Sequence, residues 1–258
     1  MAGSLKVVVF GQSNTRGVQL SEPADSWPNL LQALLSAELG QPAAMVVRPF
    51  FAHVDGSQDY LEGELARHQP DLVILTVTTF PFAHTTIEAG FRQRFGDRAG
   101  GAYHRVASGL DDATRNRGPL ARSINRGSRA LAKRLLPSGV SASYAAALDG
   151  TLTAIRCLAR LEQVDAIVFH GFVRVPTRTG GALSAQGQLI RSFLAAGSAT
   201  AAEVRIPFLN MQQRAGGIPA NWYMPDGLHV TLQAHEEIAA TLLRSLREMN
   251  LMARTEAP

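Results

Sequence analysis

Ser13 follows an apolar run after Gly11 and Gln12 in the stretch VVVFGQSNTRG (residues 7–17), and Asp226 and His229 lie three residues apart in MPDGLHVTLQAHEEIAATLL (residues 224–243). When Asp and His share a tight turn, the carboxylate can accept a hydrogen bond from the imidazole Nδ1, which fixes the tautomer and stabilises the imidazolium. The imidazole Nε2 is then free to take a proton from a serine hydroxyl. Ser13, Asp226 and His229 are therefore candidates for a nucleophile, an orienting carboxylate and a general base.

Each of these motifs also has a plain structural interpretation. Ser13 could instead contact a phosphate or serve as a turn residue. Asp226 and His229 could only cap the following helix and close the loop before it. The elements that must position the three residues help to separate these interpretations.

Short apolar runs alternate with helical patterns along the chain. The runs that predict strands are Lys6–Phe10, Ala44–Phe50, Leu72–Val77, Ala166–His170 and Val204–Leu209. The patterns that predict helices are Trp27–Leu39, Gln58–His68, a pair within Leu120–Leu161, Ser184–Ala196 and Leu232–Met249. This alternation predicts a parallel sheet covered on both faces by right-handed crossovers. Ligands collect at the carboxyl ends of parallel strands, and Ser13 follows one such end.

The length of 258 residues and the hydrophobic content of 46% suffice for one continuous core, so we expect a single domain over residues 1–258. Within it, Phe80–Pro119 is rich in Gly, Arg and Asp and has weak periodicity, which predicts a long loop or lid above the strand ends. The whole insertion spans residues 80–134.

The net charge of +4 is unevenly distributed. Eleven Lys or Arg and three Asp give the segment Phe91–Arg134 a charge of +8, so the rest of the chain carries −4. Such a segment could hold a phosphate, a nucleic acid or an anionic sugar, or its arginines could simply be solvated. Aromatic residues are sparse within it and it has no nucleic-acid-binding motif, so nucleic acid is disfavoured as a partner.

Cys157 is the single cysteine, which excludes a disulfide framework and a cysteine-based zinc site. It lies in the helical pattern LTAIRCLARL, where we expect a buried, inert thiol. No metal or cofactor is predicted. The first apolar run is too short for a signal-peptide core, and no run approaches the roughly 18 apolar residues of a membrane span, so we expect a cytoplasmic protein with no membrane partner.

Taken together, FGQSNT, the alternation of strands and helices, and PDGLHVTLQAHEEIA resemble the SGNH, or GDSL-like, hydrolase family over nearly the whole chain. The resemblance implies a flavodoxin-like three-layer α/β/α sandwich with a five-stranded parallel sheet. It also implies hydrolysis of esters, thioesters or O-acetyl groups by a serine nucleophile with a C-terminal Asp-x-x-His pair, here Ser13, Asp226 and His229.

The first block of that family is Gly-Asp-Ser, and Gly11-Gln12-Ser13 matches it with Gln12 in place of the Asp. The string GQSN is similar to that of carbohydrate O-acetylesterases in the same superfamily, whose typical methionine is Thr15 here. By this resemblance the Ser13 N–H contributes to an oxyanion hole. Gln12 and Asn14 beside it are candidate substrate-binding residues.

The second block is a glycine after the second strand whose N–H also faces the oxyanion. Gly56 holds that place ahead of the helix predicted from Gln58, where N–H groups at a helix start would point the right way. An ordinary turn glycine is the alternative, since any tight loop favours Gly.

The third block departs from the family pattern of Gly-x-Asn after the third strand. Phe80 stands at the Asn position, and a phenyl ring cannot donate to an oxyanion. Thr78, Thr79 or Asn125 could supply the missing donor. We prefer Thr78, because alternation in a strand puts it on the same side as the lost Asn. Thr79 and Phe80 are then candidate substrate-binding residues.

His170, Arg174 and Arg178 follow the end of the fourth predicted strand and could line the pocket. His170 could equally be a hydrogen-bonded core histidine, and that interpretation is preferred.

The function expected from these residues is that of a serine esterase that hydrolyses small acyl esters, O-acetyl or short-chain, through an acyl-enzyme on Ser13 and without a cofactor. Its substrate would be a small-molecule ester, such as an acylated carbohydrate or an anionic ester. Two alternatives use the same scaffold: an acyltransferase with the same triad, and a non-catalytic carbohydrate-binding module. A phosphate- or nucleotide-binding protein is disfavoured, because FGQSNTRG lacks the Lys-Ser/Thr ending of a P-loop and the dinucleotide glycine spacing.

Overall fold

The computed structural model describes residues 4–79, 137–173, 183–214, 219–224 and 229–250. The positions outside these described residues include the predicted insertion and Phe80, Asn125, Arg174, Arg178 and Asp226. The chain divides into two compact units, residues 1–78 with 150–258, and residues 79–149. The single domain expected from the sequence stays a prediction.

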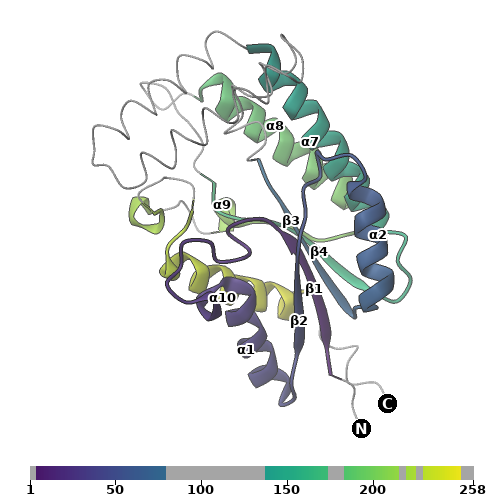
Figure 1. Cartoon of the computed structure of the whole chain (residues 1–258), viewed down its shortest axis with the longest axis vertical. Coiled ribbons are helices and arrows are strands. Elements are labelled where there is room, and N and C mark those ends of the chain that lie inside the picture. The colour runs from purple at the N-terminus through teal and green to yellow at the C-terminus, as the bar shows by residue number, and fades with distance from the viewer. Residues whose placement is uncertain (1–3, 80–136, 174–182, 215–218, 225–228, 251–258) are drawn as a thin grey trace, which may run out of the picture. The chain divides into compact units, whose positions relative to one another are not determined.

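A five-stranded sheet, in which every neighbouring pair of strands is parallel, forms the centre of the first unit (Figure 1). Its strands are β1 (Lys6–Gly11), β2 (Ala44–Pro49), β3 (Leu72–Val77), β4 (Asp165–His170) and β5 (Phe208–Asn210), in the order β2-β1-β3-β4-β5. This is the flavodoxin-like strand order. The predicted α/β class with a five-stranded parallel sheet is therefore confirmed.

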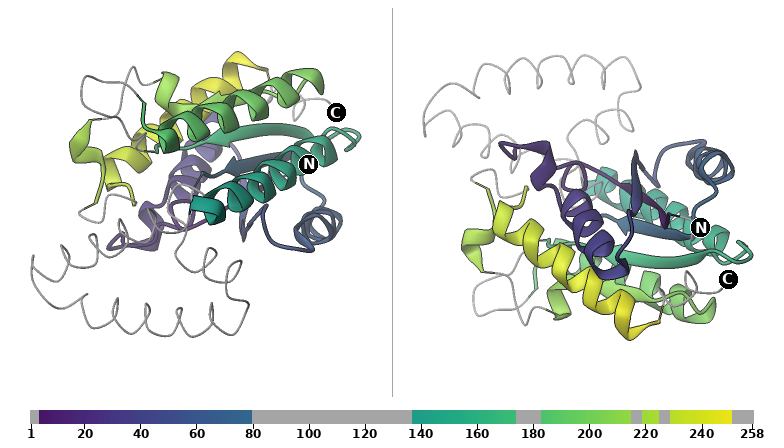
Figure 2. Two further views of the ribbon diagram at one scale, coloured as in Figure 1. Left: turned by 90° about the horizontal axis from the view of Figure 1, so that it is seen from above. Right: turned by 90° about the horizontal axis from the view of Figure 1, so that it is seen from below.

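The helices described in the first unit lie on both faces of this sheet (Figures 1 and 2). They are α1 (Trp27–Leu39), α2 (Ser57–His68), α7 (Pro137–Leu158), α8 (Ala185–Glu203), α9 (Met211–Arg214) and α10 (Leu232–Glu248), with the 3-10 turns η1 (Pro23–Asp25) and η3 (Ala220–Trp222). Helices α1 and α10 cover one face, and α2, α8 and the C-terminal part of α7 cover the other. The first unit is thus the predicted three-layer α/β/α sandwich.

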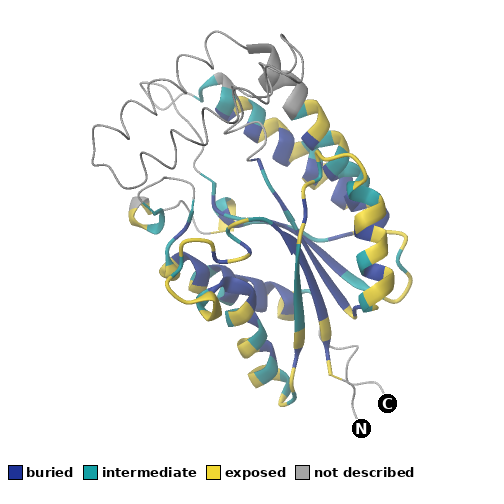
Figure 3. Ribbon diagram, in the orientation of Figure 1, coloured by how far each residue is buried: buried dark blue, intermediate teal, exposed yellow. Residues whose placement is uncertain are grey.

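Strand β1 shows why the apolar runs become central strands. Its residues from Val7 to Phe10 are at most 1% exposed, and Figure 3 shows the central strands as buried. β-Branched side chains fit a pleated surface, and burial on both faces is typical of parallel sheets. Because side chains alternate along a strand, Val7 and Val9 pack in the same core as Trp27 of α1 and Ile238 of α10.

The fifth strand differs from its prediction. The sequence predicted a strand over Val204–Leu209, whereas α8 continues through Glu203 and β5 is Phe208–Asn210. The Ile206 N–H donates to the Ala201 carbonyl at 2.8 Å, and Arg205 has a left-handed φ of 59°. The apolar residues Val204 and Ile206 therefore close the helix before the strand begins.

Candidate active site

A tight turn follows β1 and presents Ser13. A Cβ atom at Gly11 would lie 2.1 Å from the Thr15 Oγ1, so the turn can fold back over the strand end only because residue 11 has no side chain. The Ser13 carbonyl accepts hydrogen bonds from the N–H groups of Arg16 (3.2 Å) and Val18 (3.0 Å). These bonds fix the backbone of the turn at the carboxyl end of β1.

Ser13 itself is accessible. Its side chain is exposed, whereas Thr15 two positions later is 1% exposed. Within the part of the chain that the structure describes, neither the Ser13 hydroxyl nor its N–H has a hydrogen-bond partner. Both groups are therefore available to a bound molecule.

Asn14 joins this turn to the C-terminal motif. Its Oδ1 accepts a hydrogen bond of 3.2 Å from the N–H of Val230, the residue directly after His229. Ser13 and His229 are each adjacent in sequence to one partner of this bond. The structure thus brings two of the three predicted triad residues to the same place.

The backbone around His229 is held by a short antiparallel pairing. The His229 carbonyl accepts from Met224 N–H (2.8 Å), Thr231 N–H donates to the Trp222 carbonyl (2.9 Å), and Tyr223 and Val230 form a β-bridge. Residues 225–228 connect the two sides of this pairing and lie outside the described residues, so the orienting role of Asp226 stays a prediction.

No hydrogen bond joins the Ser13 hydroxyl to the His229 imidazole in the structure. In enzymes without bound substrate, catalytic hydrogen bonds are often long and tighten only when the substrate binds. The proton transfer from Ser13 to His229 therefore belongs to the proposal below.

Gly56 lies at the N-cap of α2 with a left-handed φ of 76°, a conformation that favours glycine. The loop before Gly56 makes one hydrogen bond and one close backbone contact with neighbouring segments. Gln12 Nε2 donates to the Phe50 carbonyl at 3.3 Å, and a Cβ at Gly150 of α7 would lie 1.8 Å from the Ala52 carbonyl oxygen. Gly56 is thus a helix-capping glycine, and its contribution to an oxyanion hole stays a prediction.

The two threonines after β3 differ in exposure. Thr78 is half-buried and has an interaction partner, whereas Thr79 is 1% exposed and its buried hydroxyl has no hydrogen-bond partner. A substrate oxygen cannot approach a hydroxyl that is sealed from solvent, as that of Thr79 is. This difference supports the preference for Thr78, whose role as a donor remains a prediction.

His170 ends β4 and is 2% exposed. Burial lowers its pKa from 6.5 to about 4, although a hydrogen bond with the Asn210 side chain acts in the opposite direction. This is the environment of a neutral core histidine. The hydrogen-bonded core histidine preferred from the sequence is found only in part, because among the described residues its buried Nδ1 has no hydrogen-bond partner.

Two further titratable residues are buried. His235 of α10 is 0% exposed, and its Nδ1 accepts a hydrogen bond of 3.0 Å from the Trp27 N–H; sequence reasoning did not single out this residue. Cys157 lies 3.5 Å from the Glu62 carboxylate, and burial raises the pKa of its thiol to about 11. Such a thiol is inert at neutral pH, as expected.

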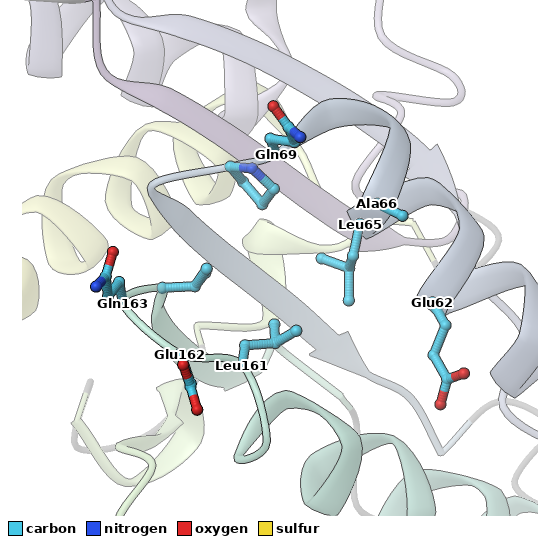
Figure 4. Close-up of a pocket in the computed structure, with 9 residues that line it drawn as sticks. Glu62, Leu65, Ala66, Gln69, Leu161, Glu162 and Gln163 are labelled. Carbon is cyan, nitrogen blue, oxygen red and sulfur yellow. The ribbon is translucent and has the colours of Figure 1, made fainter.

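A groove of about 420 Å³ lies beside the amino ends of β3 and β4 (Figure 4), whereas Ser13 follows the carboxyl end of β1. Its lining comes from the end of α2 and from the segments before β3 and β4, namely Glu62, Leu65, Ala66, Gln69, Pro70, Leu161, Glu162, Gln163 and Val164. These residues precede β3 and β4, whereas Thr78 follows β3 and His170 ends β4. None of the predicted site residues lines this groove.

The described residues hold no group of three or more His, Cys, Asp or Glu side chains that could bind a metal ion. Among the same residues, no helix is long and apolar enough to cross a membrane.

Known proteins resemble this chain in structure rather than in sequence. No family model and no curated protein matches the sequence. TesA has a similar structure, with a TM-score of 0.54 and 16% identity over 94% of this chain and 98% of TesA. A lipase/acylhydrolase from Enterococcus faecalis has a TM-score of 0.54 and 16% identity, over 95% of this chain and 96% of the lipase/acylhydrolase. A W190I mutant of Axe2, an acetyl-xylooligosaccharide esterase from Geobacillus, has a TM-score of 0.53 and 11% identity, over 94% of each chain. The fold is therefore the α/β fold of SGNH hydrolases, as the resemblance in the sequence implied.

Proposed function

We propose that the chain is a serine esterase that hydrolyses small acyl esters, O-acetyl or short-chain, through an acyl-enzyme on Ser13. The observation that carries the proposal is the hydrogen bond between Asn14 and Val230, because it joins the turn of the nucleophile to the residue beside the general base. The exposed hydroxyl of Ser13 and its unpaired N–H support the same role.

In the proposed reaction His229 Nε2 takes the proton of the Ser13 hydroxyl, and Ser13 Oγ attacks the ester carbonyl carbon. The imidazolium of His229 then gives this proton to the alkoxide that leaves. Water, deprotonated by His229, attacks the acyl-enzyme. The bond from Ser13 Oγ to the acyl carbon then breaks, the His229 imidazolium returns the proton to Ser13 Oγ, and the carboxylic acid is released. Asp226 keeps the imidazole in the tautomer that allows both transfers.

The oxyanion of each tetrahedral intermediate needs donors that are already in place. We assign this role to the N–H groups of Ser13 and Gly56 and to the hydroxyl of Thr78. Thr78 would replace the Asn side chain whose position Phe80 occupies.

The choice of substrate follows from two observations. The structures that resemble this chain include an acylhydrolase and an acetyl-xylooligosaccharide esterase, which supports acetylated carbohydrates as the first esters to test. The charge of +8 over Phe91–Arg134 supports a preference for anionic esters. That preference should weaken with salt, because attraction between exposed charges is screened.

A fluorophosphonate probe and a panel of acyl esters test the proposal together. Wild-type protein should be labelled stoichiometrically and should hydrolyse acetyl or short-chain esters, while Ser13→Ala should do neither. Ser198→Ala, which removes an exposed serine on α8, serves as the matched control and should behave as wild type. Loss of a serine nucleophile typically lowers turnover by about 10⁶-fold.

The same experiment separates the alternatives. A labelled protein that consumes ester only after an acceptor alcohol or sugar is added would be an acyltransferase. A folded protein that is neither labelled nor active would be a non-catalytic module, and the proposal would be wrong.

A further inference from the structure

His235 has no role in the reaction proposed above, yet it is one of the most buried polar residues described. It lies in the first turn of α10, six residues after His229, and is 0% exposed. Its backbone N–H donates to the Thr231 carbonyl at 3.1 Å, which places it on the turn that leads back to His229.

The His235 ring contacts the start of another helix. Its Nδ1 accepts a buried hydrogen bond of 3.0 Å from the backbone N–H of Trp27, the first residue of α1. A ring nitrogen that accepts carries no proton, so the neutral ring has its proton on Nε2. Nε2 is buried and has no hydrogen-bond partner among the residues that the structure describes. An unpaired buried N–H destabilises a fold, so a residue that carries one is expected to have another use.

The N-terminus of α1 has a local residue that could cap it without His235. Ser26 occupies its N-cap, where serine normally accepts from the first free N–H groups. Here the Ser26 side chain makes no capping bond, and its Oγ instead accepts from Asn29 Nδ2 at 3.0 Å. The cap is therefore supplied by a residue 208 positions away, on the helix that follows His229.

His229 and His235 are also close enough to interact electrostatically. Burial is the main reason why the pKa of His235 falls from 6.5 to about 4, and the charge of His229 lowers it further. His235 therefore stays neutral at pH 7, and its ring can act as the acceptor that Trp27 requires.

We propose that His235 is a positioning residue for His229: by accepting from the Trp27 N–H, it fixes the first turn of α10 against the start of α1, and so fixes His229 relative to the turn that carries Ser13. This inference rests on the proposed function. With the Asn14–Val230 bond, it gives the segment that bears His229 two anchors, one before and one within the first turn of α10.

Two polar variants of similar size separate this role from simple packing. In His235→Asn the side-chain oxygen can take the place of Nδ1, whereas in His235→Gln the amide reaches the place of Nε2 and the Nδ1 acceptor is lost. We expect the second-order rate of fluorophosphonate labelling to fall about tenfold to a hundredfold in His235→Gln and to stay near wild type in His235→Asn, since a displacement of about 1 Å can cost a hundredfold in rate. The kcat per labelled site should fall with little change in KM.

Equal labelling rates in His235→Gln and wild type would overturn the inference. Equal losses in both variants would overturn it as well, because the acceptor would then not be the cause. A merely structural role predicts a lower melting temperature and fewer labelled sites, with an unchanged kcat for each site that remains.

Imidazole NMR keeps this inference separate from the esterase proposal. If wild-type protein is not labelled, the proposed function fails, but the His229 ring resonances should still shift in His235→Gln and not in His235→Asn. Unshifted His229 resonances in both variants would contradict the positioning role. Should His235→Gln fail to fold, the wild-type His235 ring must still show the neutral Nε2–H tautomer at pH 7, and any other tautomer overturns the inference.

Discussion

The Val230 N–H donates a hydrogen bond of 3.2 Å to the Asn14 side-chain oxygen, although the two residues are 216 positions apart. One partner follows Ser13 and the other follows His229. This hydrogen bond therefore joins the N-terminal segment that carries Ser13 to the C-terminal segment that carries His229. The sequence motifs alone place these residues at strand and helix boundaries. The hydrogen bond shows that the fold brings the segments after Ser13 and His229 into contact.

Removal of the Asn14 acceptor should therefore impair catalysis more than folding. We expect Asn14→Ala to lower kcat by about tenfold to a hundredfold through displacement of His229. The free energy of unfolding should fall by only about 1 kcal/mol, the net worth of a typical hydrogen bond. Asn14→Asp keeps an oxygen acceptor and should retain more activity. Wild-type kcat in Asn14→Ala would contradict the anchoring role.

The proposed triad predicts non-additive effects. Ser13→Ala and His229→Ala should each abolish turnover while the far-UV circular dichroism stays unchanged, and the double variant should be no slower than either single one. Asp226→Asn should retain more activity than either. The turnover rates of all variants are measured with the same acetyl ester at saturating concentration. Near wild-type activity in Ser13→Ala would disprove the mechanism.

The turn after β1 depends on the absence of a side chain at Gly11. Gly11→Ala places a Cβ 2.1 Å from the Thr15 Oγ1, so the turn must shift, and we expect a loss of about 1–3 kcal/mol in stability together with a loss of activity. Gly63→Ala in α2 is the matched control, because among the described residues no heavy atom beyond its chain neighbours and the backbone of its own helix lies within 4 Å of its added Cβ. Alanine favours a helix interior over glycine by up to about 1 kcal/mol, so this control should raise the melting temperature. Equal melting temperatures for the two variants would contradict the steric account.

Two buried histidines predict how stability depends on pH. Burial lowers the pKa values of His170 and His235 from 6.5 to about 4. Between these values the unfolded chain binds more protons than the folded one, so stability is fully present above pH 6.5 and falls as the pH drops toward 4. Urea unfolding of wild type and of His170→Asn at pH 7.5 and at pH 4.5 measures how far the free energy of unfolding falls on acidification. The variant should lose less stability on acidification, and parallel losses would contradict the prediction.

The fold could be read from the sequence because its strands carry strong local signals. The predicted bounds of β3 and α1 agree with the structure, since β3 is a run of β-branched and leucine residues and α1 has Pro28 in its first turn and Gly40 at its end. The bounds of β5 were wrong because Val204 and Ile206 have strand propensity but are used to close α8.

The site was only partly predictable from the sequence. Ser13 and His229 stand out because each combines a reactive side chain with a recognisable turn or helix boundary. His235 does not, because its proposed positioning role depends on one hydrogen bond to Trp27, a residue at the other end of the chain. A histidine on the buried face of an amphipathic helix has the same local pattern whether or not such a bond exists.

The proposed oxyanion hole lacks the Asn of the SGNH pattern, whose position Phe80 occupies. Loss of one oxyanion donor typically costs about 3 kcal/mol, or about a hundredfold in turnover. Thr78 is half-buried, whereas the hydroxyl of Thr79 is sealed from solvent and unpaired. We therefore expect Thr78→Val to lower kcat by about a hundredfold with little change in KM.

Thr79→Val is the matched control for this prediction. Valine keeps the shape of threonine, and replacing an unpaired buried hydroxyl with a methyl group should leave the rate unchanged and should not destabilise the fold. A loss of kcat in Thr79→Val alone would move the donor to that residue. If both variants run at the wild-type rate, only backbone groups form the oxyanion hole. Phe80→Asn, which restores the donor of the SGNH pattern, should then accelerate the enzyme.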